Sequence, residues 1–210
     1  MENRFQHAEE CWQCGTPAEN SLFCKYCHSL QKPRLDYYEF FGLERKLNLD
    51  EDDLRRRFYD LSRLLHPDRY TRKPGTEQQY SLEAAAILND AYRILRDPVS
   101  RAEYVLKQAG FEAVEPRSKN VDPELLEEVF ELNMTLEELR SGDDSARAEL
   151  TVARDKFTAM REEMDRELKN LFDEYDASKS EHVLADIRAL LDRRRYIQNL
   201  VAEVDKELAA

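Results

Sequence analysis

Residues 54–68 read Leu-Arg-Arg-Arg-Phe-Tyr-Asp-Leu-Ser-Arg-Leu-Leu-His-Pro-Asp, and this stretch decides the fold of the central part of the chain. Four apolar residues recur at helical spacing and predict the buried face of one helix: Leu54, Phe58, Leu61 and Leu65. Arg56, Tyr59 and Arg63 fall on roughly the opposite face. Pro67 disfavours helical angles at His66 and has no N–H for the helix ladder, so the helix is expected to end there. The tripeptide 66–68 is therefore predicted at the tip of a basic, solvated helix.

The residues before this helix predict its start and a shorter helix upstream. Asp50 is a suitable N-cap, and Asp52 and Asp53 complement the helix dipole. Residues 36–43 are rich in aromatic side chains and predict a brief helix that ends near Gly42.

The residues after the tripeptide predict a loop and two more helices. Residues 69–75 are basic and are expected to form a flexible loop. A second helix is predicted over residues 77–95, packed antiparallel against the first through Ala84, Ile87, Leu88, Ala91 and Leu95. Asp97 and Pro98 then supply an N-cap and a first position for a short fourth helix, which Gly110 ends.

This order of elements resembles the J-domain of DnaJ-type co-chaperones, in which a His-Pro-Asp tripeptide engages an ATP-driven chaperone of the DnaK class. The stretch Asn89-Asp-Ala-Tyr92 is similar to the corresponding part of J-domains. A His near a helix end often only benefits from the helix dipole, and a basic helix face is often only solvated. Neither explanation accounts for the tripeptide between two amphipathic helices. The resemblance implies a chaperone-binding surface made of Arg55, Arg56, Tyr59, Arg63, His66, Pro67 and Asp68.

The overall charge limits the possible partners. The chain has 210 residues and a net charge of −12, from 44 acidic and 32 basic side chains, which disfavours nonspecific nucleic-acid binding. Seven Arg or Lys residues nevertheless lie between Arg55 and Lys73, against only Asp60 and Asp68. This local excess favours an acidic protein partner for that segment. No apolar run approaches the roughly 20 residues of a membrane-spanning helix, and residues 1–10 lack the features of a signal or transit peptide, so a cytoplasmic protein is expected.

All four cysteines lie in two C-x2-C pairs, Cys11/Cys14 and Cys24/Cys27, around a nine-residue loop. Each pair turns two sulfurs toward one point, which is typical of tetrahedral thiolate coordination, and Gly15 can supply the tight turn. One structural Zn²⁺ is the preferred interpretation; iron in a rubredoxin-like site is a minor alternative, and two disulfides are disfavoured because nothing directs export. His28 is expected at the surface rather than as a ligand, because four thiolates complete the site.

The C-terminal half predicts three more helices. Apolar residues repeat at intervals of three and four over 125–139, 150–175 and 183–208, with a break at residues 141–144. Short turns between them predict an antiparallel three-helix bundle. Leu126, Phe130 and Met134 form a second apolar stripe on the first of these helices. The stripe is either part of a wide buried face or an exposed patch flanked by acidic residues, and its pattern leaves both open.

From Cys11 onward the chain is similar to the HscB family, J-protein co-chaperones of iron–sulfur cluster assembly. The resemblance is carried by the tripeptide 66–68, by Asn89-Asp-Ala-Tyr92 and Ser100-Arg-Ala-Glu-Tyr104, by the acidic C-terminal helices and by the Cys-Trp-x-Cys-Gly start that some members share. It implies that the first bundle helix binds a cluster scaffold. The matching positions are Leu126, Glu127, Phe130, Glu131, Met134 and, from the last helix, Tyr196. Bacterial members usually have Glu at the position of Met134 and an apolar residue at the position of Glu127.

Together these observations predict an all-α protein in three parts: a metal-binding module over 1–34, a J-domain helical hairpin over 35–110 and a three-helix bundle over 111–210. The resemblance implies a co-chaperone that binds an IscU-type scaffold and presents it to an HscA- or DnaK-class chaperone, whose ATPase it stimulates. No nucleophile–base arrangement predicts an enzyme. The alternatives are a general DnaJ-like co-chaperone for unfolded clients, a zinc-ribbon nucleic-acid protein and a thiol redox enzyme with reactive C-x2-C thiols.

Overall fold

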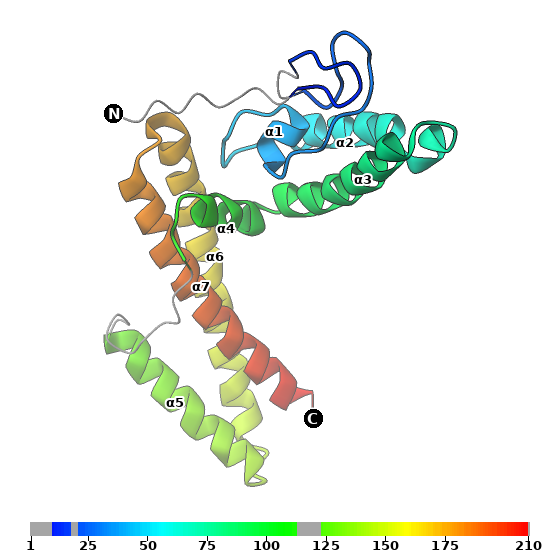
Figure 1. Cartoon of the computed structure of the whole chain (residues 1–210). Helices are drawn as coiled ribbons and strands as arrows, with labels where there is room; N and C mark the ends of the chain where they lie inside the picture. Colours follow the sequence, from blue (N-terminus) through cyan, green and yellow to red (C-terminus); the bar gives the residue numbers. More distant parts are fainter. Residues whose placement is uncertain (1–9, 18–20, 113–122, 210) are drawn as a thin grey trace. The chain divides into compact units, whose positions relative to one another are not determined.

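The computed structural model describes residues 10–17, 21–112 and 123–209, and within these ranges the protein is helical (Figure 1). The helices are α1 (Tyr37–Phe41), α2 (Glu51–Leu65), the 3₁₀ helix η1 (Pro67–Tyr70), α3 (Gly75–Arg96), α4 (Pro98–Gln108), α5 (Pro123–Arg140), α6 (Ala146–Ser178) and α7 (Glu181–Leu208). The extended backbone of the described ranges is limited to two isolated β-bridges, Glu10 with Pro17 and Phe23 with Leu30. The predicted all-α class is confirmed. The chain divides into two compact units that meet within α4, at Arg101 and Ala102.

The start and end of α2 lie where the sequence predicts them. The side chain of Asp50 accepts hydrogen bonds from the backbone N–H groups of Asp52 and Asp53, at 2.9 and 3.0 Å. At the other end His66 has an extended ψ of 127°, because the residue before a proline avoids helical angles. Helix α2 therefore begins at Glu51 and ends at Leu65.

The core of the N-terminal unit lies between α2 and α3, which run side by side in Figure 1. Helix α2 buries Leu54 and Leu65, and the half-buried ring of Phe58 stacks on Tyr92 with centroids 4.2 Å apart. Helix α3 buries four of its five predicted packing residues, while Ile87 is half-buried: Ala84, Leu88, Ala91 and Leu95 are the buried ones. Since both faces repeat at helical spacing, the predicted helical hairpin is confirmed.

The loop predicted over residues 69–75 is wrong in its first two residues and at Gly75, where α3 begins. Arg69 and Tyr70 belong to η1, and Tyr70 is buried with its hydroxyl donating to the carbonyl of Leu64 at 3.1 Å. An isolated aromatic residue in a basic stretch shows no periodicity, so the sequence pattern did not indicate that Tyr70 packs back on the hairpin.

The composition of Lys32-Pro-Arg34 predicts a short linker, but the structure shows a packed connection. Gln31 and Pro33 are buried, and Leu30 beside them is fully buried against α3. The tetracysteine segment therefore lies directly on the helical hairpin. A linker composition alone does not reveal whether the chain packs where it passes a neighbouring element.

The C-terminal unit contains α5, α6 and α7, with α6 and α7 forming a long pair and α5 lying along α6 (Figure 1). The predicted breaks are present: Gly142 has a φ of +97° after α5, and Lys179 ends α6 in the left-handed region. Each helix buries most of its predicted stripe, including Leu132 on α5, Phe157 on α6 and Ile187 on α7. The predicted three-helix bundle is confirmed. The connection expected over 111–121 and the N-cap Asp122 lie largely outside the described residues.

The helices of the described ranges are all too short or too polar to cross a membrane. The cytoplasmic location expected from the sequence stays a prediction.

Candidate functional site

The His-Pro-Asp tripeptide lies at the exposed end of the α2–α3 hairpin. His66 and Asp68 expose most of their side chains, at 56% and 87%. The Nδ1 atom of His66 accepts a hydrogen bond from the backbone N–H of Asp68 at 3.3 Å and lies 3.6 Å from the Asp68 carboxylate. Because Nδ1 serves as an acceptor in this bond, the neutral form of His66 carries its proton on Nε2. The tip therefore presents a donor and a carboxylate in a turn that Pro67 stiffens.

Two hydrogen bonds from outside α2 hold the end of that helix in place. Ser81 of α3 is fully buried and donates from its hydroxyl to the carbonyl of Leu65 at 2.7 Å. Tyr70 donates to the neighbouring carbonyl of Leu64 at 3.1 Å. The last carbonyls of a helix have no partner within the helix, so these two side chains supply donors that α2 itself cannot. Sequence reasoning missed both; a lone Ser on the apolar face of α3 was the available signal.

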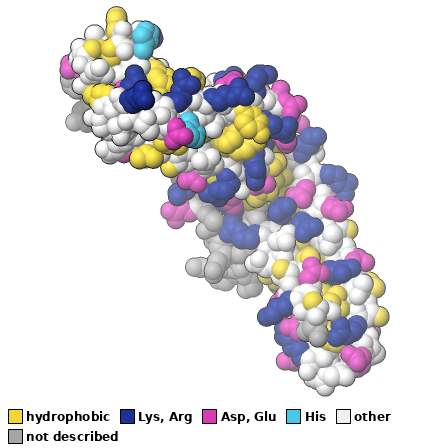
Figure 2. Space-filling model, turned by 90° about the vertical axis from the view of Figure 1, so that its right-hand side faces the viewer, with side chains coloured by type: hydrophobic (Ala, Val, Ile, Leu, Met, Phe, Trp, Pro, Cys, Tyr) yellow, Lys and Arg dark blue, Asp and Glu magenta, His cyan; other side chains and the backbone are white. Residues whose placement is uncertain are grey.

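The predicted basic surface of α2 is exposed, but not all of its charge is free. Arg55 lies 3.2 Å from Asp52, and Arg56 contacts Asp53. Such exposed pairs are weak and break easily on binding. Tyr59 and Arg63 are exposed on the same helix. Figure 2 shows dark-blue Lys and Arg side chains on the upper part of the face it presents. The chaperone-binding role of these residues stays a prediction.

Arg57 has a structural role that the sequence pattern did not indicate. Its guanidinium donates to the carbonyls of Phe41 and Gly42 at 3.1 and 3.0 Å and to Asp53 at 2.8 Å. Arg57 thereby ties the end of α1 to the first turns of α2. Its charge is engaged in these contacts and is less available to a partner than the charge of the exposed Arg63.

The four cysteine sulfurs converge on one point. All four Sγ atoms lie within 4.8 Å of one another, with Cys11 and Cys27 at 3.6 Å and Cys14 and Cys24 at 3.7 Å. Four thiolates around a tetrahedral metal ion with bonds of about 2.3 Å would be about 3.8 Å apart, whereas a disulfide requires about 2.05 Å. The donor set therefore fits a single metal ion. His28 is exposed and is not part of the cluster, as expected.

The surroundings favour the thiolate form at two of the four cysteines, Cys11 and Cys24. At Cys27, hydrogen bonds with Ser29 lower the pKa, but burial and the neighbouring thiols of Cys14 and Cys11 raise it more. Burial raises the pKa of the Cys11 thiol, but hydrogen bonds with the Ser29 hydroxyl and with backbone N–H groups lower it to about 5. Backbone N–H groups of Cys27 and Tyr26 lower the pKa of Cys24. Gly15 adopts the predicted positive φ, +70°, and His28 adopts a φ of +58° at the matching position of the second turn. Metal coordination requires thiolates, and the two tight turns bring all four sulfurs to one point where a bound ion would favour that form.

A buried carboxylate joins the tetracysteine segment to α3. Glu77 is only 4% exposed, and its side chain accepts a hydrogen bond from the backbone N–H of Leu30 at 2.9 Å. The Nε1 of Trp12 donates to the carbonyl of the same residue at 2.8 Å, and the Trp12 ring meets Tyr80 edge-on at 6.4 Å. Both backbone groups of Leu30 are thus used in attaching the segment, and both partners were missed by sequence reasoning.

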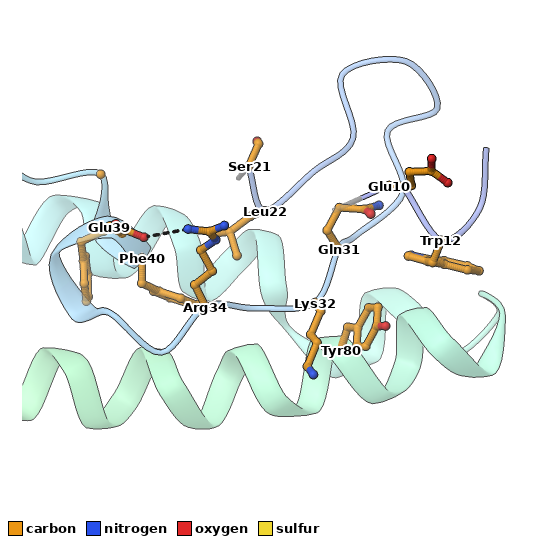
Figure 3. Close-up of a pocket in the computed structure, with 12 residues that line it drawn as sticks. Glu10, Trp12, Ser21, Leu22, Gln31, Lys32, Arg34, Glu39, Phe40 and Tyr80 are labelled. Carbon is orange, nitrogen blue, oxygen red and sulfur yellow. Dashed lines mark hydrogen bonds and ion pairs between the residues drawn. The ribbon is translucent and has the colours of Figure 1, made fainter. Parts of the chain in front are cut away.

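A cavity of about 610 Å³ opens beside this attachment (Figure 3). Trp12 and Tyr80 lie at one side of it, while Arg34 and Glu39 form a 3.3 Å ion pair at the other. Charges of both signs line it together with aromatic rings, so its chemistry selects no single ligand class.

The second apolar stripe of α5 is exposed. Phe130 is 67% exposed, Met134 50% and Leu126 38%, and Glu127 and Glu131 are exposed beside them. The structure thus favours the exposed-patch interpretation of the stripe over the buried one. Phe130, Glu131 and Met134 line a groove of about 650 Å³ between α5 and α6. Leu126, Glu127 and Tyr196 do not line this groove, and Tyr196 is half-buried on α7.

A network of ion pairs around the buried Arg188 joins α4 to α7 in the C-terminal unit. Arg188 is 6% exposed and contacts Glu103, with one nitrogen–oxygen distance of 2.9 Å, and Asp192 at 2.6 Å. Arg195 also reaches Glu103, at 3.0 Å. Partial burial raises the pKa of Glu103, but the two guanidinium groups lower it more, so that its pKa is below the usual value. The sequence analysis placed Glu103 only in a family motif and did not predict this contact.

Comparison with known proteins gives the following matches. A model of the DnaJ domain matches residues 36–104, and one of the HSCB C-terminal oligomerisation domain matches residues 121–205. The chain is 30% identical over 203 residues to the iron–sulfur cluster co-chaperone protein HscB of Mus musculus, covering 94% of this chain and 82% of the relative. It is 31% identical over 184 residues to the Homo sapiens protein of the same description, covering 85% and 76%.

Two solved structures of HscB proteins also match this chain. The crystal structure of human co-chaperone protein HscB matches with a TM-score of 0.71 at 28% identity, over 94% of this chain and 97% of that one. Chaperone HscB from Vibrio cholerae matches with a TM-score of 0.56 at 28% identity, over 81% and 96%.

Proposed function

The chain belongs to the HscB family of J-domain co-chaperones of iron–sulfur cluster assembly, and on that premise we propose that it couples a cluster scaffold to an ATP-driven chaperone. In this proposal α5 binds an IscU-type scaffold, and the α2 tip presents His66, Pro67 and Asp68 to an HscA- or DnaK-class ATPase. The observation that carries it is the exposure of two chemically opposite surfaces in separate compact units: a basic helix with a polar tip, and an apolar stripe among carboxylates.

The co-chaperone acts by changing the relative stability of its partner's states. Docking of the tip would favour the conformation of the chaperone that hydrolyses ATP and holds the scaffold tightly, and the size of that shift equals the difference in binding free energy between the two states. The protein itself makes and breaks no covalent bond in this scheme. The stiffness of the tip matters because a turn already held by Ser81 and Tyr70 loses little conformational entropy on docking.

The metal module has a structural role in this proposal. We assign one Zn²⁺ to Cys11, Cys14, Cys24 and Cys27, because four thiolates at tetrahedral distances leave no position for water or substrate. Iron in the same S₄ site is the minor alternative. The Glu77 and Trp12 contacts then connect the folded module to α3.

The two surfaces can be separated by two substitutions measured in two assays. His66→Gln should abolish stimulation of single-turnover ATP hydrolysis by the purified chaperone and leave scaffold affinity unchanged. Phe130→Ala should weaken scaffold binding at least tenfold and leave stimulation in the absence of scaffold unchanged. The matched control for His66→Gln is His182→Gln, and the control for Phe130→Ala is Leu35→Ala. Each control replaces an exposed residue of the same or similar type elsewhere in the chain. An unchanged ATPase rate with His66→Gln would falsify the proposed mechanism.

The general DnaJ-like alternative predicts a different selectivity. A co-chaperone for unfolded clients would bind many denatured proteins, and denatured protein would compete with the folded scaffold for α5. Competition titrations with a reduced, unfolded model protein decide between the two: the scaffold proposal expects no displacement.

A further inference from the structure

The groove between α5 and α6 has apolar walls from both helices. Phe130 and Met134 stand on the α5 side. Val152 stands on the α6 side and is 70% exposed, although α6 buries most of its other large apolar side chains. A single exposed apolar residue needs no explanation, but three around one groove of about 650 Å³ form the kind of patch that marks an interaction surface. Figure 1 shows α5 lying along the first part of α6, where Val152 occurs.

The rim of the groove is acidic. Four carboxylates and one ammonium group line it: Glu128, Glu131, Glu138, Glu149 and Lys156. Lys156 pairs with one oxygen of Glu128 at 2.8 Å. The other oxygen, Oε2, is shielded from solvent and has no hydrogen-bond partner among the residues that the structure describes. A shielded carboxylate oxygen without a donor is unfavourable, which leaves Glu128 with a single ion-pair partner in the wall of the groove.

We propose that the scaffold docks in this groove, with Val152 and Glu149 of α6 as specificity-determining contacts, and not on the face of α5 alone. The groove would take an apolar side chain between Phe130 and Val152, while Lys or Arg residues flanking that side chain meet the acidic rim. This inference rests on the proposed function, because it specifies where the scaffold of that proposal binds and by what chemistry.

The charge of the rim also argues against a second copy of the chain as the occupant. In a twofold pairing the same patch meets itself, so the carboxylates of one copy would face the carboxylates of the other. Facing like charges oppose association, whereas a basic segment would be attracted. A partner with an apolar residue among basic ones therefore fits the groove better than another acidic surface does.

The test is calorimetric titration of the purified scaffold into the full-length protein. Val152→Arg should weaken binding at least tenfold, because it fills the groove and repels a basic partner, and Val152→Ala should weaken it on the order of fivefold through lost apolar contact. Glu149→Gln should weaken binding less and reduce its dependence on salt. Ala177→Arg, an exposed position on α6 about 37 Å further along the helix, is the control and should bind like the wild type.

The outcomes separate this inference from the proposed function. If Phe130→Ala weakens binding and the Val152 variants stay within twofold of the wild type, the scaffold uses α5 alone and the inference is overturned while the proposed function stands. If neither residue matters, both fail. If Val152→Arg instead converts a dimer to a monomer in analytical ultracentrifugation without changing scaffold affinity, the groove binds a second copy and the inference is again overturned. Thermal unfolding should be unchanged in every variant, since Val152 is exposed.

Discussion

The two compact units hold their exposed recognition residues in different ways. In the N-terminal unit, the tip of α2 depends on a few buried polar contacts, such as the one from Ser81 to the carbonyl of Leu65. In the C-terminal unit, Phe130 and Met134 project from a helix whose other apolar stripe is packed on α6. A recognition turn thus requires particular hydrogen bonds, whereas a recognition stripe requires only that a neighbouring face of its helix is packed.

The difference predicts how each surface fails. Removing one polar contact should loosen the tip of α2, because the buried carbonyl of Leu65 loses the donor that Ser81 supplies. Removing one apolar contact under α5 should leave the stripe in place, because the packing is shared among many residues such as Leu132, Leu136 and Phe157. The following predictions test this contrast.

The largest expected effect is that of metal removal. Structural zinc sites contribute about 10–16 kcal/mol to folding of their modules, so chelation should unfold the two described parts of the tetracysteine segment, residues 10–17 and 21–31. Because Glu77 joins this segment to α3, the first turns of α3 should also lose protection, while α5, α6 and α7 should not change. Hydrogen exchange with mass-spectrometric detection, with and without chelator, measures this. Equal loss of protection in both units would contradict the contrast.

An intermediate effect is expected from Ser81→Ala. The substitution leaves the buried carbonyl of Leu65 without its donor, which should lower the free energy of unfolding of the N-terminal unit by about 1–3 kcal/mol. Urea denaturation measures the change, with the half-buried Ser62→Ala on α2 as control. Stimulation of the chaperone ATPase should fall, but less than with His66→Gln. Full stability together with full stimulation would show that the tip does not depend on this bond.

The smallest effect, and one that depends on pH, is expected from Glu103→Gln in the C-terminal unit. The folded protein holds the pKa of Glu103 below its ordinary value. The carboxylate therefore stabilises the fold at pH values above the unfolded pKa of about 4.3. This contribution is lost as the pH falls through the pKa of the folded state. Because Glu103 is about one-third exposed, solvent screening limits its contribution to the free energy of unfolding to on the order of 1 kcal/mol.

Denaturation of the wild type and of Glu103→Gln at several pH values measures this contribution. The difference between them should be full at pH 7 and should shrink as pH falls from about 5. A difference that is constant down to the lowest pH at which both fold would mean that ionisation of Glu103 adds nothing.

Much of the fold follows from local patterns. The boundaries of α2, the positive φ of Gly15 and the break at Gly142 depend on a cap, a turn residue or a proline that acts on its immediate neighbours. The four metal-ligand candidates follow from spacing for the same reason. The burial of Tyr70 and Pro33 was not predicted, because neither residue belongs to a periodic apolar pattern.

The sequence by itself therefore determined the helices, their ends, the exposed tripeptide at the tip of α2 and the converging cysteines, because these depend on short-range geometry and on periodicity. Only the tertiary structure decided which polar side chains are buried and what they bond, as with Glu77, Ser81 and Arg188. It also decided that the stripe of α5 is exposed and that Val152 of α6 completes a groove beside it. The physical reason is that burial of a side chain depends on which distant element packs over it, and no local pattern records that element.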